Sequence, residues 1–277
     1  ILRLSNFAHG DFMTLGAYAT ALLTLNGLPL PFAVLAGMIL SSLLGLLIGT
    51  STLRLREDYL AIVTIGVSEL IRLVALNEEW LTKGAFGIQR YPLPFDFEPN
   101  IFVKLLFIGS LTVLAIYAEA ILLRSLKRQF QENQHIQGKS YQPRKPLALI
   151  IWGAIATFLI LFAYVPGVVS LYNYSYKAGL MLLTLLVLAL VYTGLEFLVH
   201  SPWGRILKAI REDEEIPRAL GKNVFWYKLQ SFMLGGAIAG LAGAFLAWQL
   251  TTIYPSNFEP LLTFQAWIIV VLGGAGS

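Results

Sequence analysis

The longest uncharged stretch of the sequence constrains the fold most. No charged residue occurs in the 42 positions from Phe12 to Leu53, and a membrane-spanning helix needs roughly 20 mostly apolar residues. The stretch is long enough for two such helices. The turn signal Asn26-Gly27-Leu28-Pro29 divides it near its middle, where glycine and proline favour a break. We therefore expect an apolar hairpin of two spans.

Further apolar runs follow along the chain. They are Tyr59 to Leu76, Ile101 to Leu123, Leu147 to Val165, Ala178 to Val199, Leu229 to Ile253, and Leu261 onward. The composition agrees, because 57% of the residues are hydrophobic and only 13% are charged, about half the charge of a soluble domain. The predicted fold is an all-α polytopic membrane helix bundle with about eight spans or part-spans.

The basic residues indicate the orientation of these spans. If the spans alternate strictly, 15 Lys and Arg lie on one side, and three, Lys83, Arg90 and Lys177, lie on the other. Cytoplasmic loops carry the excess of basic residues in membrane proteins. We therefore expect residues 124–146, a polar insertion, and 201–223 to be cytoplasmic. The net charge of +4 fits this topology better than nucleic-acid binding.

No catalytic or metal-binding pattern stands out. The chain has no cysteine, and its three histidines lack metal-ligand spacing. The segment NQHIQGKS, residues 133–140, ends like a phosphate-binding loop but has Asn133 where that motif needs glycine. We expect no cofactor and no enzymatic activity. The sequence begins at Ile1 without an initiator Met, and we interpret 1–277 as a single transmembrane domain truncated at both ends.

Small residues recur at spacing four in two of the predicted spans. Such ladders let helix backbones approach closely in lipid. We expect internal bundle packing from them, in preference to a subunit interface. The residues are Gly37, Ser41, Gly45 and Gly49 in the second span, and Gly236 and Gly240 followed by Ala244 in a later one.

A few polar residues lie within or beside the apolar runs. Glu69 and Arg72 share one helix face at spacing three, and each is costly in the membrane unless it is paired or faces water. They form either a structural ion pair that holds two helices together or part of a translocation path. Asn6 and His9 precede the first apolar run and are further candidates for lining such a path.

The stretch SPWGRILKAIREDEEIPRALGKN, residues 201–223, is unusually charged for this chain. It holds nine of the 36 charged residues in the 18 positions from Arg205 to Lys222. Ser201 and Pro202 predict a helix start, Gly221 predicts a helix end, and Asn223 can cap the next span. The stretch predicts an elbow of two short helices on the cytoplasmic face. A cytoplasmic partner explains it better than topology alone.

Several blocks together resemble a known family. GRILKAIREDEEIPRALGKNVFWYKLQSFMLGGAIAGLAGAF, YPSNFEP, IIVVLGGAGS, LRLREDYLAIVTIGVSELIRL and LTKGAFGI look like the permease subunit of branched-chain or neutral amino-acid ABC importers. The resemblance covers most of the chain apart from about Ile101 to Val165, and its details are similar to permeases of cyanobacterial neutral amino-acid importers. Pro217 stands where relatives commonly carry Ala.

The resemblance implies a role for the elbow as the coupling helix that contacts an ATP-hydrolysing subunit. The residues at that interface would be Arg211, Glu212, Asp213, Glu214, Glu215, Arg218, Ala219 and Gly221. It also implies a heterodimer with a second related permease, a periplasmic amino-acid-binding protein, a multi-pass location in the bacterial inner membrane, and transport by alternating access. A permease for urea or short amides shares these blocks. A stand-alone ion-coupled secondary transporter is a third hypothesis, with Glu69 and Arg72 as its only candidate coupling site.

Overall fold

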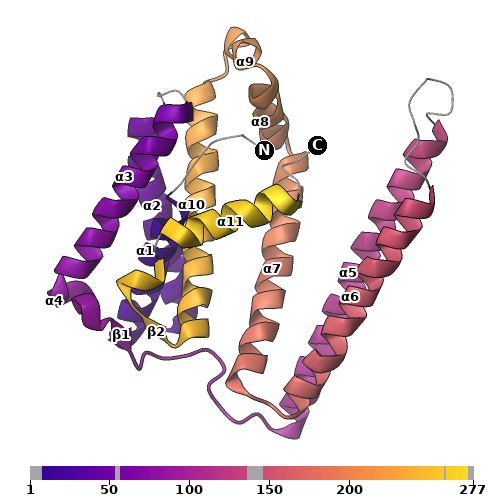
Figure 1. Ribbon diagram of the computed structural model, residues 1–277, viewed down its shortest axis with the longest axis horizontal. Coiled ribbons are helices and arrows are strands. Elements are labelled where there is room, and N and C mark those ends of the chain that lie inside the picture. The colour runs from indigo at the N-terminus through magenta and orange to yellow at the C-terminus, as the bar shows by residue number, and fades with distance from the viewer. Residues whose placement is uncertain (1–7, 54–56, 136–145, 259, 274–277) are drawn as a thin grey trace. The chain divides into compact units, whose positions relative to one another are not determined.

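The chain folds into helices that divide into two compact units. The structure is a computed structural model that describes residues 8–53, 57–135, 146–258 and 260–273. Unit 1 comprises Ile1–Pro94 with Thr193–Ser277, and unit 2 comprises Phe95–Tyr192. Helices predominate throughout the described residues, with one pair of two-residue strands (Figure 1). The predicted all-α class is confirmed.

In the described part of the chain, eight long helices correspond to the eight expected spans. They are α1 (His9–Leu25), α2 (Leu30–Thr52), α3 (Glu57–Asn77), α5 (Ile101–His135), α6 (Pro146–Tyr172), α7 (Tyr176–His200), α10 (Val224–Leu250) and α11 (Pro260–Gly273). The break between α1 and α2 falls at the predicted turn, where Gly27 has a φ of 88°. α5 is longer than expected, so the first part of the segment 124–146 continues this helix. Residues 136–145 lie outside the described part.

Five of these helices are long and apolar enough to cross a membrane, as judged over the described residues. They are α2, α5 from Ile101 to Lys127, α6 from Gly153 to Tyr172, α7, and α10. α1 and α11 have 17 and 14 residues, and α3 carries the charges of Glu69 and Arg72. The expected eight therefore separate into five full spans and three shorter or more polar helices.

Close contact between α1, α2 and α10 forms the centre of unit 1. A Cβ atom added at Gly16 of α1 would overlap the backbone of Gly240 in α10, and one added at Gly240 would overlap the Ser41 side chain of α2. Gly37 and Gly45 of α2 approach the backbones of α1 and α10 less closely, and a Cβ atom there would lie 3.0 Å and 3.3 Å from its nearest neighbour. The two small-residue ladders thus meet inside one bundle, where backbones can touch.

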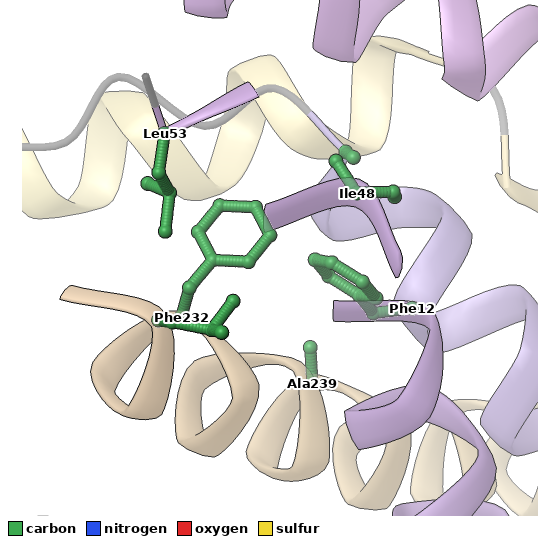
Figure 2. Packing of buried hydrophobic residues seen from close by; sticks show 7 residues of the cluster. Phe12, Ile48, Leu53, Phe232 and Ala239 are labelled. Carbon is green, nitrogen blue, oxygen red and sulfur yellow. The ribbon is translucent and has the colours of Figure 1, made fainter. Parts of the chain in front are cut away.

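Aromatic and aliphatic side chains fill the space beside these glycines. Phe12 of α1 and Phe232 of α10 meet edge to face with ring centroids 5.9 Å apart, and Ile48 and Leu53 at the end of α2 complete the cluster (Figure 2). The Ser41 hydroxyl donates a 2.9 Å hydrogen bond to the carbonyl of Phe12. This bond satisfies a buried hydroxyl and ties α2 to α1.

Short elements occupy one end of unit 1. α4 (Glu79–Thr82), η1 (Gly84–Phe86) and β1 (Ile88–Gln89) follow α3, and β1 pairs antiparallel with β2 (Thr252–Ile253). The Tyr91 hydroxyl donates to the carbonyl of Ala247 in α10. α8 (Pro202–Glu212) and α9 (Glu215–Ala219) lie at the opposite end of the unit (Figure 1). Lys83 and Arg90 are thereby separated from the basic residues of the elbow, as the predicted topology requires.

Unit 2 is built around the antiparallel helices α5 and α6 (Figure 1). Phe107 and Leu111 of α5 form a core with Leu171 of α6 and with Ala178 and Leu182 of α7. Two side-chain hydrogen bonds also link α5 and α6, and each involves a hydroxyl group of α6. These bonds join Thr157 to the Glu119 carboxylate at 2.9 Å and Tyr164 to Thr112 at 2.9 Å. Outward-facing apolar side chains such as Phe162 and Leu190 are exposed, as expected of a surface that meets lipid.

Candidate functional site

The elbow of residues 201–223 contains the two short helices that its sequence predicts. The Ser201 hydroxyl accepts a hydrogen bond from the amide of Gly204, and Pro202 occupies the first turn of α8. Leu207 and Ile210 are buried against Val224 at the start of α10. α8 therefore uses its apolar face to pack on the membrane helix that follows it.

α9 begins with an acidic cap and ends with glycine. The Asp213 carboxylate accepts a 2.8 Å hydrogen bond from the amide of Glu215, which is one of the amides that a helix start leaves without a partner. At the other end, Gly221 has a φ of 74°, and the amides of Gly221 and Lys222 donate to the carbonyls of Arg218 and Pro217. This is the Schellman arrangement, which favours glycine at the left-handed position.

Pro217 lies in the first turn of this short helix, where proline is tolerated. It is the third residue of α9, so its missing amide hydrogen would have had no acceptor within the helix. The residue is buried. The departure from the alanine expected in relatives therefore leaves α9 intact.

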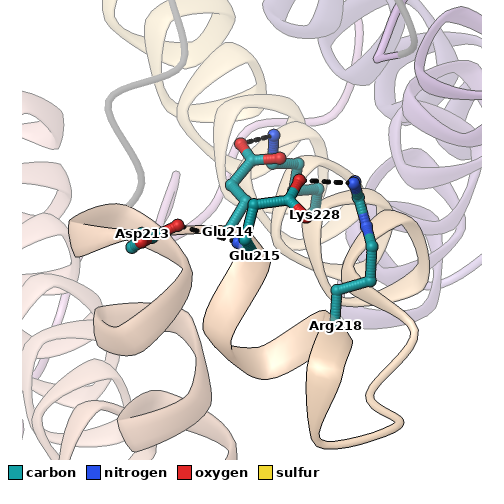
Figure 3. A network of polar contacts seen from close by, with 5 residues as sticks. All are labelled: Asp213, Glu214, Glu215, Arg218 and Lys228. Carbon is teal, nitrogen blue, oxygen red and sulfur yellow. Dashed lines mark hydrogen bonds and ion pairs between the residues drawn. The ribbon is translucent and has the colours of Figure 1, made fainter.

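Three ion pairs involve charged side chains of the elbow, and Figure 3 shows those of Glu214 with Lys228 and of Glu215 with Arg218. Glu214 pairs with Lys228 of α10, and Arg218 pairs with Glu215 one turn earlier at 2.7 Å. A third pair joins Arg211 to the exposed Glu212 at 2.8 Å. The last two pairs are solvent-exposed and contribute little to stability, so their charges remain available to a partner. Glu214, in contrast, is directed toward the protein's own helix.

Two polar contacts between the elbow and α10 were not anticipated from the sequence. Besides the Glu214–Lys228 pair, the indole of Trp203 donates a 2.8 Å hydrogen bond to the side-chain oxygen of Gln230. Lys228 and Gln230 lie in the first two turns of α10. The side-chain oxygen of Asn223 accepts a 3.1 Å hydrogen bond from the amide of Trp226. This predicted cap starts α10 directly after the elbow, and it is the one sequence signal that Lys228 and Gln230 lie near the elbow.

The exposed surface of α9 combines charge with two large apolar side chains. Leu220 at the end of α9 is 74% exposed, and Ile216 is 59% exposed. Ala219 and Arg218 are exposed beside them. The arrangement offers an apolar contact surrounded by ionic groups, which is typical of the centre and rim of a protein–protein interface.

Glu69 and Arg72 pair with each other along one helix. The Arg72 Nη2 donates to Glu69 Oε1 at 2.5 Å, and its Nε donates to Oε2 at 3.0 Å. Both bonds lie within α3. The two alternatives for the pair, a lock between helices or part of a translocation path, stay predictions. The guanidinium fork matches the carboxylate geometry, and pairing reduces the cost of placing both charges in an apolar helix.

The structure describes one of the two path candidates that precede the first apolar run. Asn6 lies outside the described residues. His9 begins α1 and is half-buried. Asp11, which the site prediction omitted, is buried in α1, and the Ser68 hydroxyl of α3 donates a hydrogen bond to its carboxylate. The only sign of this burial in the sequence is that Asp11 directly precedes the uncharged stretch that begins at Phe12. Across the described residues, no group of three or more His, Asp or Glu could hold a metal ion.

Comparison with known proteins identifies the family. The family described as branched-chain amino acid transport system / permease component matches residues 1–277. The high-affinity branched-chain amino acid transport system permease protein LivM of Salmonella typhimurium is 30% identical over 271 residues, which cover 97% of this chain and 52% of that protein. LivM of Escherichia coli is 30% identical over 270 residues, with the same coverage of 97% and 52%.

A more distant relative comes from an archaeon. The probable branched-chain amino acid transport permease protein LivM of Methanocaldococcus jannaschii is 23% identical over 277 residues, covering 97% of this chain and 59% of that protein. The chain thus spans a little over half the length of these curated relatives. The similarity to cyanobacterial permeases stays a prediction.

No solved structure matches the chain. The assignment therefore rests on the sequence match and on the apolar helices. The family match extends over residues 1–277, and five helices within the described part are long and apolar enough to cross a membrane. The chain belongs to the permease components of branched-chain amino acid transport systems, and it is a multi-pass protein of the bacterial inner membrane.

Proposed function

We propose that this chain is the permease subunit of an ATP-driven importer for branched-chain or neutral amino acids. The observation that carries the proposal is the family match over residues 1–277. The substrate class is supported by the relatives, whose names specify branched-chain amino acid transport. The subunit forms half of the translocation path and has no catalytic role of its own.

The proposed energy source is a separate pair of cytoplasmic ATP-binding subunits. α9 contacts such a subunit through Ile216 and Leu220, with Glu212, Asp213 and Arg218 at the rim. Exposed apolar groups within a charged rim support this assignment, because a few central apolar contacts dominate most interfaces. A second related permease completes the path, and a periplasmic binding protein delivers the amino acid. ATP-driven movement of the elbow opens the path inward by alternating access.

Transport by the reconstituted complex tests the function. The full-length chain, its permease partner, the ATP-binding subunits and the binding protein are placed in proteoliposomes, and uptake of labelled leucine, alanine, proline, glutamate and urea is measured. We expect uptake of apolar amino acids that requires both ATP and the binding protein. Uptake of urea alone, or amino-acid uptake driven by an ion gradient without ATP, would contradict the proposal.

Retention of the ATP-binding subunits tests the coupling role of α9. Leu220→Glu places a carboxylate at the most exposed apolar position of the elbow and is expected to weaken subunit binding by about tenfold or more, the loss typical of a central interface residue. Phe86→Glu is the matched control, because Phe86 is an 81% exposed apolar residue in η1 at the opposite end of unit 1. Equal retention of the ATP-binding subunits by both variants would exclude the docking role.

A further inference from the structure

α1 presents two different faces to the rest of unit 1. Successive residues of an α-helix are rotated by about 100°, so Phe12, Gly16 and Thr20 lie on one side. Gly16 contacts α2 and α10, and the carbonyl of Phe12 accepts a hydrogen bond from α2. Asp11 and Tyr18, seven positions apart, lie together on the opposite side. α1 therefore packs through one face and buries a polar face on the other.

Asp11 and Tyr18 on this second face each have a polar atom without a partner among the described residues. Asp11 is 2% exposed, and its Oδ2 atom has no hydrogen-bond partner among the described residues. The hydroxyl of Tyr18 is buried and is likewise without a partner within the described part of the chain. Burying a carboxylate oxygen or a hydroxyl without a hydrogen bond costs free energy. Two such groups on one face of one helix indicate a binding site, in which a ligand supplies the missing hydrogen bonds.

The surroundings of Asp11 favour a cation that carries hydrogen-bond donors. The Ser68 hydroxyl already donates to the Asp11 carboxylate, and the charge of Glu69 also acts on it. Arg72 is paired with Glu69, and the positive charge of Arg72 balances only one of the two acids. If Asp11 and Glu69 are both ionised, these three residues together carry one net negative charge. Protonation of Asp11 would remove the charge but would leave a hydroxyl that also needs a partner.

Three elements, α1, α3 and α11, meet at Gly10 and Asp11. Ser68 comes from α3, and Thr263 of α11 accepts a 3.0 Å hydrogen bond from the amide of Gly10, next to Asp11. Ser68 and Thr263 are both buried. The Ser68 hydroxyl bonds the carboxylate itself and the Thr263 hydroxyl bonds the adjoining backbone amide, so oxygen acceptors from three helices lie at Asp11 or at the residue before it. A primary ammonium offers three donors to such a group.

We propose that Asp11 binds the primary ammonium group of an amino acid as it crosses the membrane. This inference rests on the proposed function. The remaining polar groups of the same face continue the path along α1. Thr14 lies one turn further, where its hydroxyl donates to the carbonyl of Gly10 at 2.8 Å and keeps acceptor capacity. Tyr18 follows one turn beyond it.

A comparison of stability with transport tests the proposal. Asp11→Asn keeps the size of the side chain but removes its charge. In the full reconstituted complex we expect leucine uptake to fall by roughly tenfold or more, the factor for one lost hydrogen bond to a charged group. The thermal unfolding midpoint is expected to stay equal or to rise, because an unpaired buried carboxylate has been removed. ATP hydrolysis stimulated by the binding protein is expected to stay within about twofold of the unmodified complex, since the elbow is unchanged.

Two further variants separate a ligand site from a structural role. Asp11→Glu restores a carboxylate and is expected to recover part of the uptake lost in Asp11→Asn. Glu119→Gln is the matched control, because it neutralises a half-buried carboxylate of α5 whose partner Thr157 can still donate to the amide oxygen. This variant is expected to transport leucine normally.

Distinct outcomes would overturn the inference. Normal leucine uptake by Asp11→Asn would show that the charge is not required. A fall in both the unfolding midpoint and the uptake of Asp11→Asn would assign Asp11 a structural role. If the unmodified complex shows no uptake that depends on ATP and the binding protein, the proposed function itself fails, and the inference fails with it.

Discussion

At the scale of single residues, glycine decides how closely the helices of unit 1 approach. The helices α1, α2 and α10 meet closely at Gly16 and Gly240, where a methyl group would overlap a neighbouring helix, and at Gly37, where it would be tightly packed. In a membrane, where apolar side chains gain little from leaving lipid, such close packing is a main source of helix association. The ladder residues are therefore structural, as their spacing of four suggests.

Alanine substitution at two glycines of α10 tests this packing. Gly240→Ala is expected to destabilise the protein by about 1–3 kcal/mol, because its Cβ would overlap Ser41 and force the helices apart. Gly235→Ala is the control, since a Cβ there meets no atom within 4 Å and alanine favours the helix by about 1 kcal/mol. Thermal unfolding in detergent gives the comparison. An equal effect of the two substitutions would exclude a packing role for Gly240.

At the scale of elements, the elbow is joined to α10 by a partly buried ion pair. The Lys228 side chain is only 15% exposed, whereas that of Glu214 is 43% exposed. α10 continues from this contact into the glycine-rich packing with α1 and α2. A displacement of α9 would thus reach the core of unit 1 through the first turns of α10. We interpret Glu214 as a positioning residue for the elbow. Its predicted contact with the partner stays a prediction.

Hydrogen exchange of the elbow tests this link. Lys228→Gln is expected to speed amide exchange in α9 by about fivefold, which corresponds to the loss of about 1 kcal/mol for a pair near the surface. Glu214→Gln should have the same effect, and the double variant should add little, because both remove one interaction. Lys222→Gln is the control, since it removes a neighbouring exposed lysine. Additive effects of Lys228→Gln and Glu214→Gln would show that the two residues act independently.

At the scale of the whole molecule, the distribution of basic residues predicts which end of unit 1 faces the cytoplasm. The elbow and β1 lie at the two ends of the unit (Figure 1). Asp213 belongs to the elbow, Arg90 directly follows β1, and both are exposed. Residues 1–277 include no cysteine, so a single introduced thiol can report on each end. The orientation of the chain in the membrane can therefore be measured with cysteines at exposed positions, which leave the buried core unchanged.

Labelling with a membrane-impermeant maleimide tests the orientation. Arg90→Cys is expected to react from the periplasmic side in intact spheroplasts, and Asp213→Cys only after the membrane is opened, because the positive-inside tendency places the elbow in the cytoplasm. Any cysteine elsewhere in the full-length protein is replaced first, and the cysteine-free protein is the control. The reverse pattern would contradict the predicted topology.

Much of the fold follows from the sequence alone, because it depends on local interactions. Hydropathy located the eight long helices, and the residues that start and end helices located the elbow, from the Ser201 cap to the Gly221 termination. Hydropathy does not fix where a helix ends. α5 continues well past Leu123 into polar residues, since a helix can leave the apolar region without breaking its backbone hydrogen bonds.

Only the tertiary structure decided which of these local features meet. Spacing four predicts a packing ladder but not its partner, and the meeting of Gly16, Ser41 and Gly240 depends on how three helices cross. The same holds for Glu214, whose partner Lys228 is 14 positions away, and for the burial of Asp11 beneath α3 and α11. Local sequence sets hydrogen bonds, caps and apolarity within an element. Contacts between elements depend on the complementary shapes of surfaces that lie far apart in the chain.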